Sequence, residues 1–141
     1  VLFRSFLLST FVTTEREKII NICETSAREV EKNNLDVLNT LVDDNFKGIL
    51  SSRTIDKKYF IDKLKEATQT VKINGVKFSS FNIVTKETSA TMKVNTIIFL
   101  TATEGMFQLP LTLEIEWVKR NDTWKILTAK ESKYMDMLMN Q

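Results

Sequence analysis

The stretch from Leu109 to Ala129, LPLTLEIEWVKRNDTWKILTA, constrains the fold more than any other part of the chain. Alternate positions from Leu109 to Trp117 are apolar, and threonine and glutamate lie between most of them. This period of two is typical of a β-strand with one buried face. Asn121-Asp122 then offers two residues that tolerate positive φ, as a two-residue hairpin loop requires. The stretch therefore predicts a long antiparallel hairpin.

The loop fixes which side chains share the buried face, because a slip of one residue would turn the whole set to water. A second loop at Glu104-Gly105 would add a preceding strand to the same sheet. The pairs expected across the two loops are Trp117 with Ile126, Ile115 with Thr128, Lys119 with Trp124, Leu100 with Leu109, Ile98 with Leu111, Val94 with Ile115, Met92 with Trp117, and Lys93 with Glu116. Both tryptophans then point inward.

Helical periodicity fills the first half of the chain. Thr14 and Glu17 form a capping box before an apolar stripe that includes Cys23, which predicts a helix over 14–32. A short second helix is expected from residue 35 to 42, a short strand over 46–50, and a third helix over 56–68 with Thr54 as its cap. A bulge at Ser79-Ser80 would let two phenylalanines of the following strand both point inward. Helices followed by a strand meander predict an α+β fold, with the helices on one face of a strongly bent, mainly antiparallel sheet.

Composition excludes several kinds of site. The 141 residues include one cysteine and no histidine, so we expect neither a metal site nor a cofactor bound through those ligands. A formal charge of +2 is too small to indicate nucleic acid as a partner. The expected organisation is one domain over 14–130 and a methionine-rich tail over 131–141.

The first thirteen residues are expected to be disordered or the remnant of a signal peptide or anchor, because FLLSTFV is apolar but too short to span a membrane. Val1 to Ser5 resembles translated adapter DNA and is interpreted as an artefact. The compartment stays open between the cytoplasm and, if FLLSTFV is such a remnant, the periplasm or a membrane surface.

Four segments in this order resemble the nuclear transport factor 2-like superfamily, and within it bacterial SnoaL-like and calcium/calmodulin-kinase-association-like domains of the cystatin-like fold. They are TEREKI, NNLDVLNTLVDDNF, SATMKV and LEIEWVKRNDTWKILTAK. The resemblance implies a cone with a pocket between the helices and the concave sheet face, and often dimers through the opposite face. Members include isomerases, dehydratases, hydrolases and cyclases as well as proteins without chemistry, so the fold alone does not fix the function.

Catalytic candidates are few. No inward position of the last three strands is Asp, Glu, Arg or Tyr. Asp43, Asp44 and Tyr59 remain, and Asp44 would serve as a general base only if apolar neighbours raised its pKa. The competing interpretations are a solvated turn-forming acid for Asp44 and a half-buried ring with a wet hydroxyl for Tyr59.

Two binding surfaces are expected from the strand faces. An apolar ligand pocket would be lined by Phe60, Met92, Thr96, Trp117 and Trp124, although the same side chains would equally serve as core. The reverse face mixes polar residues with Ile97, Phe99, Val118 and Leu127, which predicts a homodimer interface. The sequence thus favours a non-enzymatic ligand-binding or dimerisation domain. The alternative is a SnoaL-like lyase, isomerase or hydrolase that acts on a small apolar substrate through Asp44 and Tyr59.

Overall fold

The computed structural model describes residues 13–50 and 52–131. The residues assigned to the N-terminal remnant and to the tail lie outside this part, apart from Thr13 and Glu131. The described helices are α2 (Glu15–Glu31), α3 (Val37–Leu41) and α4 (Lys57–Ala67), and the strands are β1 (Val42–Leu50), β2 (Arg53–Asp56), β3 (Lys72–Thr85), β4 (Ser89–Ala102), β5 (Gly105–Arg120) and β6 (Thr123–Glu131).

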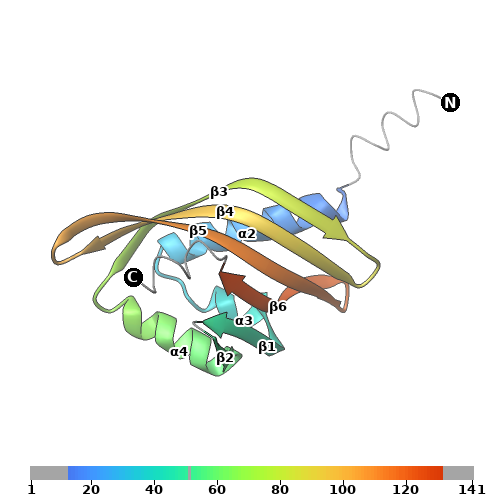
Figure 1. Cartoon of the computed structure of the whole chain (residues 1–141), viewed down its shortest axis with the longest axis horizontal. Coiled ribbons are helices and arrows are strands. Elements are labelled where there is room, and N and C mark those ends of the chain that lie inside the picture. The colour runs from blue at the N-terminus through green and yellow to red at the C-terminus, as the bar shows by residue number, and fades with distance from the viewer. Residues whose placement is uncertain (1–12, 51, 132–141) are drawn as a thin grey trace.

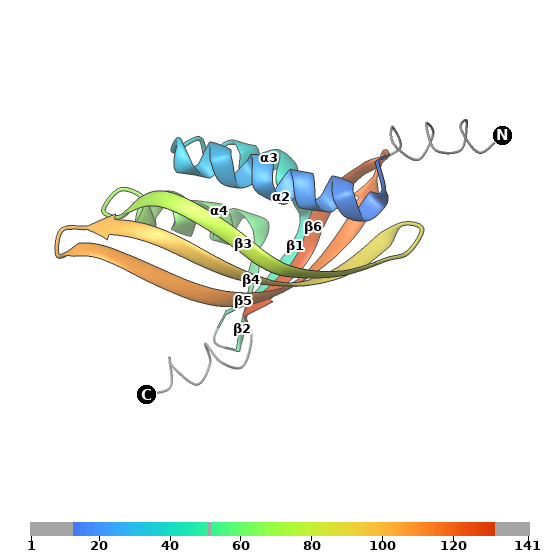
Figure 2. The ribbon, with the colours of Figure 1, turned by 90° about the horizontal axis from the view of Figure 1, so that it is seen from above.

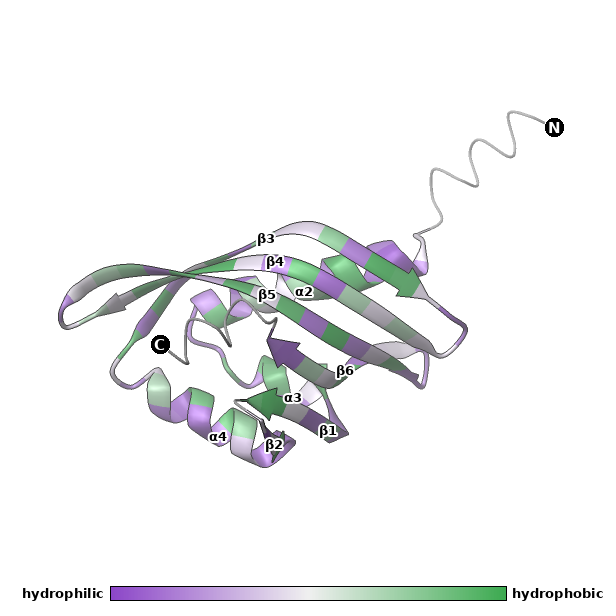
Figure 3. Cartoon of the chain, viewed as in Figure 1, coloured by the Kyte–Doolittle hydropathy of each residue, from purple (hydrophilic) through white to green (hydrophobic). Residues whose placement is uncertain are grey.

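The described strands form one sheet in the order β2-β1-β6-β5-β4-β3. All neighbours are antiparallel except β1 and β6, which run parallel. The sheet is long and bent, with α2 and α3 on one face, and α2 runs along β3 (Figures 1 and 2). Apolar and polar residues alternate along β5 (Figure 3). The predicted α+β fold with a strongly bent sheet is confirmed.

The β5–β6 hairpin turns where the sequence predicts. Asn121 and Asp122 have φ values of 49° and 67°, and Trp117 pairs with Ile126 as expected. A bulge next to Trp117 then shifts the ladder, so Ile115 pairs with Ala129 and not with Thr128. The expected inward position of Thr128 is therefore wrong, and Ala129 packs on the core in its place.

The β4–β5 register is two residues away from the prediction. Ala102 pairs with Gly105, so Thr103-Glu104 is the loop, Met92 faces Ile115 and Lys93 faces Glu114. A shift of two residues leaves every side chain on its predicted face, because the strand period is two. The predicted partners were wrong, whereas the predicted faces of β4 and β5 were right.

The bulge predicted in β3 is present. The β3–β4 ladder shifts after Ser79, and Ser80 has a φ of 55°. Phe78 and Phe81 both pack against the core, with ring centroids 5.7 Å apart.

Two boundaries in the first half differ from expectation. β1 begins at Val42, directly after α3, so Asp43 and Asp44 lie in a strand and not in a helix-ending turn. Thr54 lies in β2, and the cap of α4 is Asp56, whose side chain accepts a hydrogen bond from the Tyr59 backbone N–H. Pairing of β1 with β6, more than eighty positions away, overrides the local turn propensity of the two aspartates.

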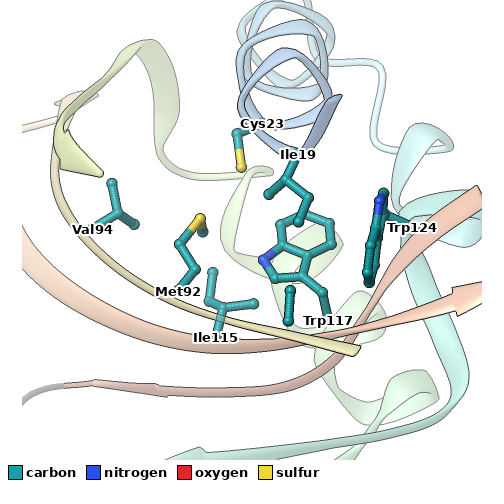
Figure 4. Close-up of a cluster of buried hydrophobic side chains, with 8 residues drawn as sticks. Ile19, Cys23, Met92, Val94, Ile115, Trp117 and Trp124 are labelled. Carbon is teal, nitrogen blue, oxygen red and sulfur yellow. The ribbon is translucent and has the colours of Figure 1, made fainter. Parts of the chain in front are cut away.

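The main core lies between α2 and the inner sheet face. Ile19 is fully buried against Trp117, and Met92, Val94 and Ile115 lie on one side of the indole in the same cluster (Figure 4). Both indoles belong to this one cluster, as the predicted register requires. Cys23 is also part of it, which confirms its interpretation as a small core residue.

A second, smaller core joins α3 and α4. It is built from Leu35, Leu38 and Ile61, with Phe60 packed at its side. Leu41, the last residue of α3, packs against both cores and so links them.

Candidate functional site

A hollow lies on the sheet face turned away from the helices, and we call it the outer trough. Its volume is about 620 Å³. Side chains from all the described strands line it, because β1–β2 borders one side and β3 the other. The lining includes Lys47, Ile49, Thr54, Asn82, Val84, Thr91, Lys93, Glu114, Glu116, Thr128 and Lys130.

The outer trough combines charges of both signs with exposed aliphatic groups. Lys130 approaches Glu114 at 4.0 Å. Lys47, Lys93 and Glu116 make no ion pair with any described residue. Ile49, on the β1 side of the trough, and Val84, on the β3 side, are 46% and 58% exposed, which is high for apolar side chains that line a hollow. An arrangement of this kind suits a partner that supplies both apolar and charged groups.

The predicted dimer-face residues flank the outer trough. Ile97, 37% exposed, and Phe99 lie toward one end of β4. Val118 and Leu127 lie toward the other end and line a groove with Val84. Ile97 and the partner of Val118 are eight positions apart on β4, about 26 Å at ~3.3 Å per residue.

The sequence did not identify most of the trough between these ends. Lys47, Ile49 and Lys130 come together only through the parallel pairing of β1 with β6, which leaves no local signal in the sequence. The positions of Asn82 and Val84 on the outer face could be predicted from the sequence, because the bulge at Ser80 determines which face each of them occupies.

The five residues of the predicted ligand pocket divide between the two cores. Met92, Thr96, Trp117 and Trp124 are at most 3% exposed on the inner side of the sheet. Phe60 lies in the second core, 5.4 Å from the Phe46 ring. The indole N–H of Trp124 donates to Glu15 at 2.6 Å. The hydroxyl of Thr96 and the indole N–H of Trp117 are buried without a hydrogen-bond partner.

Two of the catalytic candidates, Asp44 and Tyr59, lie at the surface. The Asp44 side chain is 95% exposed and pairs with Lys57 at 3.0 Å. Tyr59 is half-buried, with the Arg53 guanidinium 5.8 Å and the Lys63 ammonium 5.6 Å from its ring centroid. Neither side chain belongs to the buried clusters.

Asp43 is the one buried carboxylate among the described residues. Its oxygens accept hydrogen bonds from Arg120 Nε at 3.1 Å and from the Asn45 backbone N–H. The Arg120 hydrogen bond outweighs burial and lowers the pKa of the Asp43 carboxyl. An acid held in its charged form by an arginine is poorly suited to remove a proton at neutral pH.

No group of three or more metal-ligating His, Cys, Asp or Glu side chains occurs in residues 13–50 and 52–131. In the same part of the chain, every helix falls short of the length and hydrophobicity that a bilayer crossing requires.

No protein-family model matches the chain, and no curated protein matches its sequence. Solved structures do match its fold. An NTF2-like protein from Cytophaga hutchinsonii has a TM-score of 0.72 and 17% identity over 85% of this chain and 98% of its own. An NTF2-like protein of unknown function in nutrient uptake from Rhodospirillum rubrum has a TM-score of 0.69 and 15% identity over 81% and 96%.

A third structure, from Catenulispora acidiphila, was solved in complex with S-DNPA. It has a TM-score of 0.68 and 8% identity over 85% of this chain and 95% of its own. Sequence identities this low support likeness in fold and not in activity. The resemblance is thus confirmed at the level of architecture, and the chain has the nuclear transport factor 2-like fold.

Proposed function

We propose that this chain is a non-enzymatic domain that forms a twofold homodimer through its outer trough. The observation that carries the proposal is the coexistence of exposed Ile49 and Val84 with Lys47, Lys93 and Glu116, which form no ion pair with a described residue, on the outer face of the sheet. A surface meets itself in a twofold dimer, so it must contain both halves of every interaction. Lysines and glutamates side by side with aliphatic groups satisfy that condition.

The dimer would cover the apolar and charged side chains of the trough that are exposed to solvent in the single chain. Val84 and Ile49 would lose contact with water, with a gain of roughly 25 cal/mol for each Å² of apolar surface buried. The unpaired charges would find opposite charges in the second copy and set its orientation. Stable interfaces bury about 800 Å² per partner, which requires the flanking residues Ile97, Val118 and Leu127 as well as the trough.

Sedimentation velocity at micromolar concentration tests the proposal. We expect a dimer for the wild-type chain and a shift toward monomer for Val84→Arg, which puts a long cation on the β3 side of the trough. Met106→Arg is the matched control, because Met106 is 81% exposed near the β4–β5 loop, outside the trough. A monomeric wild type, or equal behaviour of both variants, would contradict the proposal.

A second function, binding of a small apolar ligand on the inner sheet face, is favoured by the unpartnered polar atoms of Thr96 and Trp117. Buried polar groups normally have a partner, and a ligand oxygen would supply one. The Catenulispora acidiphila protein, a neighbour in fold, was solved in complex with S-DNPA, which is in line with this proposal. Titration with anilinonaphthalene sulfonate, followed by tryptophan fluorescence, should show saturable binding that Thr96→Val weakens. Absence of saturation would remove this function.

The enzymatic alternative has less support. A SnoaL-like lyase, isomerase or hydrolase would need Asp44 and Tyr59 to converge on a substrate. Asp44 faces solvent beside Lys57, and the Tyr59 ring is flanked by two cations.

A further inference from the structure

β3 is the long edge strand of the described sheet, and its second half is free of charge. Phe78 to Thr85 reads FSSFNIVT, eight residues rich in aromatic and β-branched side chains. Uncharged segments of this composition pair readily with copies of themselves, and an exposed edge offers the unpaired backbone groups for such pairing. The opposite edge, β2, is only four residues long. The hazard of edge-to-edge association is therefore concentrated in β3.

Side chains of α2 occupy hydrogen-bonding positions that an added strand would use. At Val76, just before the uncharged segment, the backbone N–H donates to Glu31 Oε1 at 2.9 Å. The carbonyl of the same residue accepts from Arg28 Nη2 at 2.7 Å. Arg28 and Glu31 also pair with each other at 2.9 Å. Together they present one donor and one acceptor to one residue, as the backbone of a neighbouring antiparallel strand would.

Two features protect the uncharged segment itself. Arg16 lies in the first turn of α2, at the opposite end of the helix from Arg28 and Glu31. Its Nη2 donates to the Phe81 carbonyl at 3.4 Å. Ser80, with its φ of 55°, lies in the bulge that breaks the regular spacing of the edge. Bulges and charged groups are the devices by which natural sheets prevent edge pairing. α2 thus covers the edge at two points along β3, as its course beside that strand in Figure 2 illustrates.

We propose that Arg28 and Glu31 act as an edge guard, which prevents the β3 strand of a second copy from adding to the sheet. This role is separate from the proposed dimer, which uses side chains on the sheet face, including Val84 of β3, and not the backbone hydrogen-bonding groups of the β3 edge. The excluded partner is a second copy because the uncharged segment is complementary to itself. Removal of the guard should therefore give assemblies larger than a dimer.

Two substitutions at Glu31 distinguish the effect of its hydrogen bond to the Val76 N–H from the effect of its negative charge. Glu31→Gln keeps a side-chain oxygen that can accept from Val76, whereas Glu31→Leu removes it. Hydrogen exchange followed by NMR should show faster exchange of the Val76 amide in Glu31→Leu by roughly tenfold, the ratio expected for loss of one hydrogen bond of ordinary net strength. Glu31→Gln should retain most of the protection.

Self-association is the second readout. The double variant Arg28→Ala/Glu31→Leu should form thioflavin T-positive assemblies beyond the dimer at concentrations where the wild type does not. Lys63→Ala/Glu66→Ala is the control, because it removes an i,i+3 ion pair of 3.4 Å from α4, a helix that packs on β1 and β2 at the other side of the sheet from β3. Urea unfolding gives the folded fraction of each variant. Self-association is then compared under conditions in which all variants are folded.

Two results would overturn the proposal. One is a Val76 amide that exchanges at the wild-type rate in Glu31→Leu. The other is a folded double variant that associates no more than the α4 control does.

Discussion

Glu15, in the first turn of α2, is held by partners from the far end of the chain. It accepts from the Trp124 indole at 2.6 Å and pairs with Lys18 at 3.1 Å and Lys119 at 3.3 Å. The Trp124 hydrogen bond, with help from Lys18, lowers the pKa of the Glu15 carboxyl from 4.5 to about 2. The capping pattern predicted the helix start, but only the fold brings Trp124 to this carboxylate.

The lowered pKa predicts a specific acid dependence of stability. A carboxyl with a depressed pKa in the folded state stabilises the fold above its unfolded pKa of 4.5, and this contribution is lost as pH falls toward about 2. Glu15→Gln should therefore flatten the loss of unfolding free energy across that window, measured by urea titration with tryptophan fluorescence. Glu24→Gln, on the same helix but without a Trp124 contact, should retain the wild-type slope. A wild-type slope in Glu15→Gln would contradict the assignment.

Cys23 provides a second prediction at this scale. Burial in the main core, followed by the nearby Glu24 charge, raises the pKa of the Cys23 thiol from 9.0 to about 12. The thiolate is the reactive form, so the folded chain should not react with Ellman's reagent at mildly alkaline pH. One equivalent should react after unfolding in urea, because Cys23 is the only cysteine. Rapid labelling of the folded protein would contradict the buried position.

At the scale of elements, local sequence patterns predicted which sheet face each side chain occupies better than which residue it pairs with on the next strand. The alternation in β4 and β5 assigned the inner set correctly although the loop was placed at Glu104-Gly105, two residues out of register. The bulge beside Trp117 was missed, since no residue there demands it, and Thr128 was assigned to the wrong face as a result. The bulge at Ser79-Ser80 was predicted because two phenylalanines three positions apart needed the same face.

The β5–β6 turn should be sensitive to side-chain shape. Asn121 has a φ of 49°, a region in which a β-branched residue is strained. Asn121→Val should therefore lower the free energy of unfolding by about 1–2 kcal/mol. Thr123→Val is the control, because Thr123 already lies in β6 and its exposed position tolerates a branched side chain. Equal stability of the two variants in urea titrations would mean that the turn does not fix the hairpin.

At the scale of the whole molecule, the sequence could not reveal how the two halves join. The parallel pairing of β1 with β6 unites the helical half with the final hairpin, and it also shapes the outer trough. Asp43, which is buried, and Arg120, which is exposed, form an ion pair of 3.1 Å at the same junction. In the sequence alone, the residues around Asp43 resemble a turn, and those of β6 resemble an ordinary strand. The proposed dimer surface therefore depends on contacts that only the complete fold creates.

Leu41 should determine whether the molecule unfolds as one unit. It packs against both cores, whereas Leu64 packs only against the smaller one. Both tryptophans of the chain lie in the main core, so their fluorescence reports that core, while far-UV circular dichroism reports all elements. For the wild type we expect the two signals to change together in urea, as in a two-state transition.

Leu41→Ala should cost about 2 kcal/mol, the low end for a leucine truncation because Leu41 is only partly buried. It should also separate the two signals, with part of the dichroism lost before the fluorescence changes, since the smaller core would no longer be tied to the larger. Leu64→Ala should lower stability while the signals still coincide. Coincident transitions in Leu41→Ala would show that the β1–β6 pairing alone is sufficient to couple the two cores.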